Sequence, residues 1–64
     1  METLSDTMRA RVEACLDDAA PTVRAMAVWA LACHDPARVR YLASVRLPEE
    51  ADTAVRDEWL AVAL

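Results

Sequence analysis

No glycine and no lysine occur in this 64-residue chain, and only three of its side chains are aromatic, two Trp and one Tyr. All-β domains depend on glycine in tight turns and on β-branched and aromatic residues in strands. These absences, together with an apolar content of 56%, disfavour a β-sheet protein and predict an all-α fold.

Long apolar runs are also missing. No stretch approaches the roughly 20 residues that a membrane-spanning helix needs. The first segment, METLSDTMRARVEACLDD, lacks the basic and apolar regions of a secretory signal. We therefore expect a cytoplasmic protein with no membrane partner. A domain of this size buries only about 60% of its unfolded surface, which argues against a large catalytic cleft.

The charge balance is acidic, with a formal net charge of −4. Such a chain lacks the overall positive potential on which non-specific nucleic-acid binding depends. Its basic cluster consists of Arg38, Arg40 and Arg46. We expect these arginines to be solvated or paired with nearby carboxylates, while contact with RNA phosphates stays an open alternative. The nearby carboxylates are Glu49, Glu50 and Asp52.

Residue patterns that support catalysis or metal binding are scarce. Cys15 and Cys33 are far apart in the chain, without the C-x-x-C spacing of zinc, iron–sulfur or redox sites. We expect both to be small buried thiols. His34 has no nucleophile or second ligand at a suitable spacing. We therefore assign no catalytic, metal-binding or cofactor-binding residue to this chain.

Helical periodicity and capping residues divide the chain into four short helices. Prolines at the first helical position and polar caps before it mark the starts. The predicted helices cover residues 5–18 with Ser5 as cap, Pro21 to His34, a third segment from Asp35-Pro36 until Pro48, and a last segment capped by Asp52 or Thr53.

The apolar stripes predict which side chains point inward. They are Leu4, Met8, Val12, Cys15 and Leu16 in the first helix; Val23, Met26, Ala27, Ala30, Leu31 and Cys33 in the second; Val39, Leu42 and Val45 in the third; and Val55, Trp59, Val62 and Ala63 in the fourth. Val28 and Trp29 flank the second stripe, so that helix should be buried from more than one side. Trp29 and Trp59 are predicted packing anchors.

A short internal repeat is visible in the sequence. Val23-Arg24 recurs as Val55-Arg56, and each pair follows an acidic turn and opens an apolar helix. We call the step from Val23 to Val55 the repeat spacing. It predicts one domain, residues 1–64, built of two antiparallel helix pairs, at about 5–34 and 35–64. The chain stays apolar to its end, EWLAVAL, so we expect a fragment of a longer protein.

The segment from Leu16 to Leu31 resembles the HEAT-like repeat pattern of a leucine, an aspartate, a proline turn, Val-Arg and spaced alanines. The matching residues are Leu16, Asp18, Pro21, Val23, Arg24, Ala27, Ala30 and Leu31, with Val55, Arg56 and Trp59 in the second copy. Their expected roles are structural. The alanines let helices approach closely, Asp18 caps the turn, and Arg24 reaches an acid on a neighbouring repeat.

Over a longer range, AVWALACHDPARVRYLA followed by AVRDEW is similar to the C-terminal HEAT-like tail of bacterial tRNA epoxyqueuosine reductases. The resemblance implies queuosine biosynthesis, with cobalamin and 4Fe–4S clusters held by upstream domains and a tail close to tRNA. No catalytic residue carries over, because a cluster needs several closely spaced cysteines and this chain has two isolated ones.

Two hypotheses about function follow from the sequence. The first is a non-catalytic HEAT-like tail of an epoxyqueuosine reductase, which packs on the upstream catalytic domain and helps to dock tRNA. The alternative is a stand-alone HEAT-like interaction module that binds a protein partner or forms a homodimer through exposed apolar ends.

Overall fold

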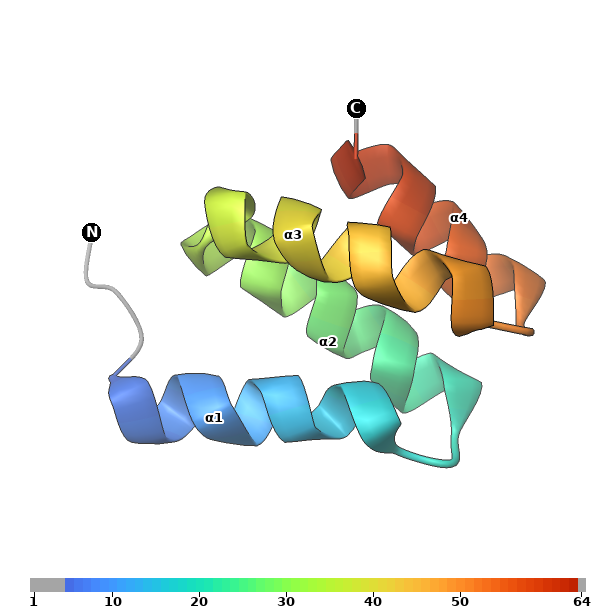
Figure 1. Cartoon of the computed structure of the whole chain (residues 1–64). Helices are drawn as coiled ribbons and strands as arrows, with labels where there is room; N and C mark the ends of the chain where they lie inside the picture. Colours follow the sequence, from blue (N-terminus) through green and yellow to red (C-terminus); the bar gives the residue numbers. More distant parts are fainter. Residues whose placement is uncertain (1–4, 64) are drawn as a thin grey trace.

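The computed structural model describes residues 5–63, which form four α-helices and no strand. The helices are α1 (Asp6–Ala14), α2 (Pro21–His34), α3 (Pro36–Arg46) and α4 (Thr53–Ala63). In Figure 1, α1 and α3 run in one direction and α2 and α4 in the opposite direction. The all-α prediction is confirmed. None of the helices in this part of the chain is long and apolar enough to cross a membrane.

Short polar side chains begin three of the helices, as the sequence predicts. The Ser5 side chain accepts the N–H of Met8 at 3.2 Å. Asp35 accepts the N–H of Arg38 at 3.2 Å, and Asp52 accepts that of Val55 at 3.1 Å. Asp52 is therefore the cap of α4, and Thr53 is its first helical residue. These bonds satisfy N–H groups that have no partner inside the helix.

The turns inside the two helix pairs explain how the chain folds without glycine. Each turn starts with a short 3-10 helix, Cys15–Asp17 or Leu47–Glu49, and then becomes extended. Asp18 has φ −65° and ψ 145°, and Glu50 has φ −81° and ψ 123°. No residue of the described range 5–63 has a positive φ. Because neither turn enters the left-handed region, neither requires glycine.

The repeat spacing of the sequence is also a spacing of the structure. Helices α2 and α4 begin at Pro21 and Thr53, and the two 3-10 helices begin at Cys15 and Leu47. In both cases the second start follows the first by the same step that separates Val23 from Val55. We refer to residues 5–34 as the first helix pair and to residues 35–63 as the second. The surface along which the two pairs pack is called the seam.

The hydrophobic core lies at the seam. Its residues are Leu16, Ala27, Val28 and Leu31 from the first pair, and Val39, Leu42, Ala43, Val55 and Trp59 from the second. Trp59 is 2% exposed and Leu31 is 0% exposed. Ala27 and Ala43 are small enough to let the backbones approach. Burial of these side chains supplies most of the stabilisation that so short a chain can obtain.

Several side chains predicted to point inward are exposed instead. Met8 is 54% exposed, Met26 65%, Trp29 64% and Val45 49%. Cys33 and Ala63 are exposed as well, and Leu4 lies outside the described residues. Trp29 is therefore not a packing anchor, whereas Trp59 is. Periodicity finds the apolar faces of a helix, but a helix with two such faces needs a neighbour on each to bury both.

Candidate functional site

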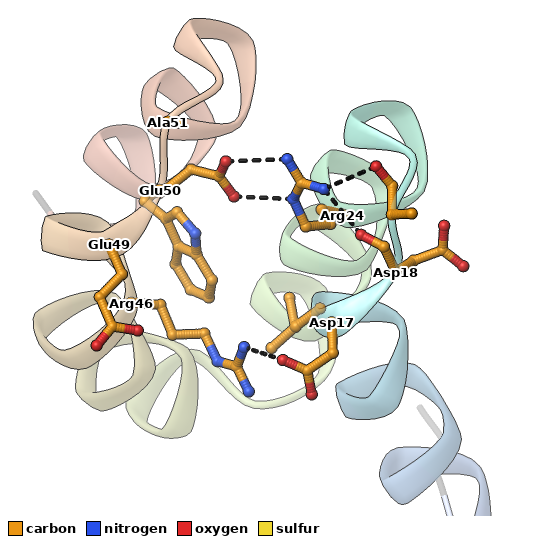
Figure 2. Close-up of a pocket in the computed structure, with 10 residues that line it drawn as sticks. Asp17, Asp18, Arg24, Arg46, Glu49, Glu50 and Ala51 are labelled. Atoms are coloured by element: carbon orange, nitrogen blue, oxygen red, sulfur yellow. Dashed lines mark hydrogen bonds and ion pairs between the residues drawn. The ribbon is translucent and has the colours of Figure 1, made fainter.

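The main cleft opens where the two turns meet at the seam (Figure 2) and has a volume of about 410 Å³. Two arginines and four carboxylates line it, together with Leu16 and Trp59 from the core. The charged residues are Arg24, Arg46, Asp17, Asp18, Glu49 and Glu50. The cleft thus brings together Asp18 and Arg24, which the sequence predicts for the repeat motif, and Arg46 from the basic cluster.

Arg24 and Glu50 form the central contact of the cleft. Arg24 Nε donates to Glu50 Oε1 at 2.9 Å, and Nη2 donates to Oε2 at 3.0 Å. The Nη1 atom donates to the backbone carbonyls of Asp18 and Ala19, at 2.8 and 3.1 Å. The Arg24 side chain is 19% exposed and that of Glu50 is 10% exposed. One guanidinium therefore holds the turn of the first pair and the turn of the second together.

Electrostatics follow from this geometry. The hydrogen bonds from Arg24 lower the pKa of Glu50, and the N–H of Asp52 acts in the same direction, while burial opposes both. The hydrogen bond with Glu50 raises the pKa of Arg24. Both groups are therefore charged at neutral pH and stabilise each other in the charged form.

A second ion pair crosses the seam beside the first. Arg46 Nη1 donates to Asp17 Oδ1 at 2.7 Å, and this hydrogen bond lowers the pKa of Asp17. The Arg46 side chain is 32% exposed and that of Asp17 is 70% exposed. Solvent screens so open a pair, which makes it weaker than the contact between Arg24 and Glu50.

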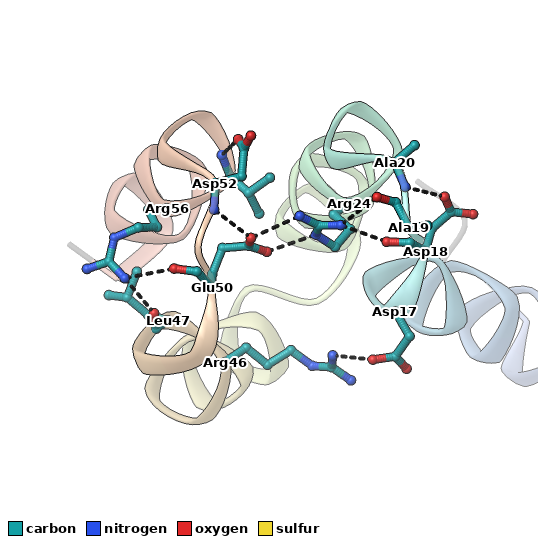
Figure 3. Close-up of polar contacts among 11 residues, drawn as sticks. Asp17, Asp18, Ala19, Ala20, Arg24, Arg46, Leu47, Glu50, Asp52 and Arg56 are labelled. Atoms are coloured by element: carbon teal, nitrogen blue, oxygen red, sulfur yellow. Dashed lines mark hydrogen bonds and ion pairs between the residues drawn. The ribbon is translucent and has the colours of Figure 1, made fainter.

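The backbone contacts of the cleft recur in the second pair, one repeat spacing later (Figure 3). Arg24 donates to the carbonyl of Asp18, and Arg56 donates to the carbonyl of Glu50 at 3.0 Å. The N–H of Ala20 donates to Asp18 Oδ1 at 2.8 Å, and the N–H of Asp52 donates to Glu50 Oε2 at 3.0 Å. Asp18 thus accepts an N–H group of its own turn, and Arg24 reaches an acid of the second pair.

The remaining motif residues have structural positions. Ala27 and Leu31 are buried in the first pair, and Val55 and Trp59 in the second. Val23 and Ala30 are partly buried, and Pro21 is the exposed first residue of α2.

The predicted basic cluster is divided by the fold. Arg38 Nε lies 3.0 Å from Glu13 Oε1, and its guanidinium carbon lies 5.4 Å from the centre of the Tyr41 ring. Arg46 is bound to Asp17, while Arg40 is exposed. Two of the three arginines therefore pair with carboxylates of the first helix pair. The expected partners Glu49, Glu50 and Asp52 are wrong, because the fold brings Arg38 and Arg46 within reach of Glu13 and Asp17 of the first pair.

Metal-ligand groups and cysteines were the remaining candidates for chemistry in this chain. Within residues 5–63, no group of three or more His, Cys, Asp or Glu side chains could hold a metal ion. Cys15 and Cys33 are free thiols, and Cys33 is exposed rather than buried as predicted. The side chains present therefore do not fit an iron–sulfur cluster. The groups with shifted pKa values are Asp17, Arg24 and Glu50, and each shift comes from an ion pair across the seam. These contacts join the two helix pairs.

A second, apolar groove lies along the first helix pair. Residues of α1 and α2 line it, with Cys15 from the turn between them: Val12, Cys15, Val23, Met26, Ala27, Trp29 and Ala30. Met26 and Trp29 are its most exposed members. The sequence predicts these residues as core, so the groove is an apolar face that nothing in residues 5–63 covers.

Sequence reasoning did not identify Glu13, Asp17, Asp35 and Glu50 as the carboxylates that form ion pairs across the seam. Glu50 could have been found from the repeat, because it follows Asp18 by the same step that separates Val23 from Val55.

Comparison with family models, with curated proteins and with solved structures gives no match to this chain.

Proposed function

We propose that this chain is a non-catalytic, HEAT-like helical-repeat module that binds protein. One observation carries the proposal: the turn geometry, with its Asp or Glu cap and an arginine bound to the carbonyl of that capping residue, occurs twice at the repeat spacing. Contacts that recur in each helix pair are expected to stack the pairs on one another. In the first copy Arg24 also binds Glu50 across the seam, and this ion pair holds the two helix pairs together.

The exposed apolar side chains support a binding role for the outer faces. Met26 and Trp29 are exposed on the first pair, and Tyr41, Val45 and Leu60 on the second. Exposed apolar residues that gather on a face are typical of protein-binding surfaces. Helical repeats commonly bind partners through such uncovered surfaces.

A charge exchange tests whether the cleft is a scaffold. Arg24→Glu and Glu50→Arg should each lower the unfolding midpoint, because each leaves two like charges facing one another in a largely buried position. The double variant should regain part of that loss, because it restores an ion pair. A double variant less stable than either single variant would show that the cleft does not act as a structural clamp.

A more specific candidate is the tail of a tRNA epoxyqueuosine reductase. The observation that favours it is that both segments that resemble the reductase tail begin helices: VRAMAVWAL in α2 and VRDEW in α4. On this proposal the chain packs on the upstream catalytic domain in the cytoplasm and leaves Arg40 to contact tRNA. Cobalamin and the iron–sulfur clusters then belong to that upstream domain.

The reductase proposal is tested by adding the chain to a reductase catalytic domain that lacks its tail. Expected results are a stable complex and faster reduction of epoxyqueuosine in tRNA. Arg40→Glu should weaken tRNA binding, whereas the control Arg11→Glu, also at an exposed position, should not. Absence of a complex would contradict the reductase assignment.

A further inference from the structure

Arg56 repeats the position of Arg24 and completes only half of its contacts. Its Nη1 atom donates to the carbonyls of Leu47 and Glu50, both at 3.0 Å. Arg24 makes the matching backbone contact and also uses Nε and Nη2 to bind Glu50 across the seam. Within the described chain, no carboxylate lies within salt-bridge distance of Arg56. Its Nε and Nη2 atoms are equivalent to the atoms with which Arg24 binds Glu50 of the next helix pair.

The acceptor that Arg56 needs can be described from the repeat. Glu50 reaches Arg24 from the turn between α3 and α4, so the equivalent acceptor stands at the turn of a helix pair stacked on the second pair. Asp18 occupies the position in the first pair that Glu50 occupies in the second. It makes the same turn contact, accepting the N–H of Ala20, and it is exposed. A second copy of this chain therefore presents a carboxylate at the required place.

The outer face of the second pair presents exposed apolar side chains at the seam positions of the repeat. Tyr41, Val45 and Leu60 are 58%, 49% and 48% exposed. The residues one repeat spacing before them all take part in the seam. Those equivalents are Arg9, which pairs with Asp35; Glu13, which pairs with Arg38; and Val28, which is 0% exposed. Apolar side chains thus stand where the first pair contacts its neighbour.

The apolar groove of the first pair is the complementary face. Val55, which packs across the seam from the second pair, corresponds to Val23, and Val62 corresponds to Ala30. Val23 and Ala30 both line the groove. The groove is therefore the surface that the first pair would turn toward a preceding helix pair, as the second pair turns Val55 toward the first.

We propose that the chain associates with a second copy of itself head to tail. The outer face of α3 and α4 in one copy packs on the groove of α1 and α2 in the next, and Arg56 binds Asp18 of that next copy. This inference rests on the proposed scaffold function. Because the two faces differ, each added copy leaves a new free face, and the assembly grows into a continuous solenoid.

Sedimentation of the intact chain over a range of concentrations tests the proposal. The average mass should rise with concentration and pass beyond that of a dimer. Arg56→Glu and Asp18→Arg should each weaken association about tenfold or more. An equimolar mixture of these two variants should restore association, because Glu at position 56 then meets Arg at position 18. Arg40→Glu is the control for the charge change and should leave association unchanged.

Arg56 also binds two carbonyls of its own turn, so Arg56→Glu is checked for helicity by circular dichroism. Should it unfold, Leu60→Asp decides, because it leaves Arg56 intact and changes a half-exposed side chain; it should abolish association with the fold retained. A chain that stays monomeric, a mass that stops at a dimer, or a mixture of folded variants that does not reassociate overturns the proposal. The stability test of the Arg24 and Glu50 exchange is independent of this outcome.

Discussion

The guanidinium of Arg24 and the carboxylate of Glu50, distant from one another in the chain, face each other through two nearly parallel hydrogen bonds of 2.9 and 3.0 Å. Arg24 belongs to α2, and Glu50 to the turn before α4. Paired hydrogen bonds of this kind fix orientation as well as distance. The contact therefore sets the register in which the two helix pairs stack.

Removal of either partner should destabilise the chain more than removal of a solvent-exposed arginine. We expect Arg24→Ala and Glu50→Ala each to lower the unfolding midpoint, and the double alanine variant to cost less than the sum of the two. The reason is that each single variant leaves a partly buried charge without its partner. Urea unfolding of the four proteins measures this coupling. Strictly additive effects would contradict a direct interaction.

Arg46→Ala provides the matched comparison, since Arg46 makes the more open ion pair with Asp17. Its effect should be smaller than that of Arg24→Ala, because solvent screens exposed pairs.

Stability should fall in acid because the pKa of Glu50 is held below its ordinary value of 4.5. The folded chain then binds fewer protons than the unfolded chain, so the free energy of unfolding decreases as the pH falls. The contribution is complete above the ordinary pKa and is lost as the pH drops through the lowered one. Asp17 acts in the same direction. Urea unfolding between about pH 7 and about pH 3 measures the slope.

Glu50→Gln is the control for the acid dependence. This variant should be less stable at neutral pH and show a flatter dependence on pH. An unchanged slope would mean that another carboxylate is responsible.

The two tryptophans should respond oppositely to substitution. Trp59→Ala should cost about 3–5 kcal/mol, because it opens a cavity in the core. That loss would unfold much of a chain whose total stability is expected to be only a few kcal/mol. Trp29→Ala should change stability by no more than about 0.5 kcal/mol at low protein concentration. Denaturant unfolding of both variants makes the comparison.

Fluorescence distinguishes the same two side chains in variants that keep an aromatic ring at each position and so disturb the core less than alanine does. In Trp29→Phe the remaining Trp59 should emit at short wavelength and resist quenching by acrylamide, as expected at 2% exposure. In Trp59→Phe the remaining Trp29 should be quenched readily, as expected at 64% exposure. The reverse pattern would show that Trp29 rather than Trp59 lies in the core, and would contradict the structure.

An added cap should stabilise the second helix. Ala20 precedes α2 and offers no side-chain cap, whereas Asp52 holds the equivalent position before α4 and accepts an N–H. Ala20→Asp should therefore raise stability by about 1 kcal/mol. Ala19→Asp adds the same charge one position earlier and should give no such gain. Thermal unfolding of both variants decides between a cap and a general charge effect.

Local features of the sequence determined the elements of the fold. Pro21, Pro36 and Pro48 with the acidic caps mark helix ends within a few residues of where the structure has them. Capping and proline geometry depend on neighbouring residues alone. The recurrence of Val23-Arg24 as Val55-Arg56 also predicted the stacking of two similar pairs, because a repeated local pattern folds into a repeated unit.

Only the tertiary structure decided which apolar faces meet and which charges pair. Met26 lies on the same apolar stripe as Leu31, and Val45 on the same stripe as Leu42, but the seam covers only Leu31 and Leu42. Arg38 pairs with Glu13 rather than with carboxylates closer in sequence, because stacking places α3 beside the first pair. Hydrophobic burial and ion pairing act across space between residues distant in the chain. The sequence of one helix therefore determines which apolar faces it can bury. The packing of its neighbours determines which of those faces are buried.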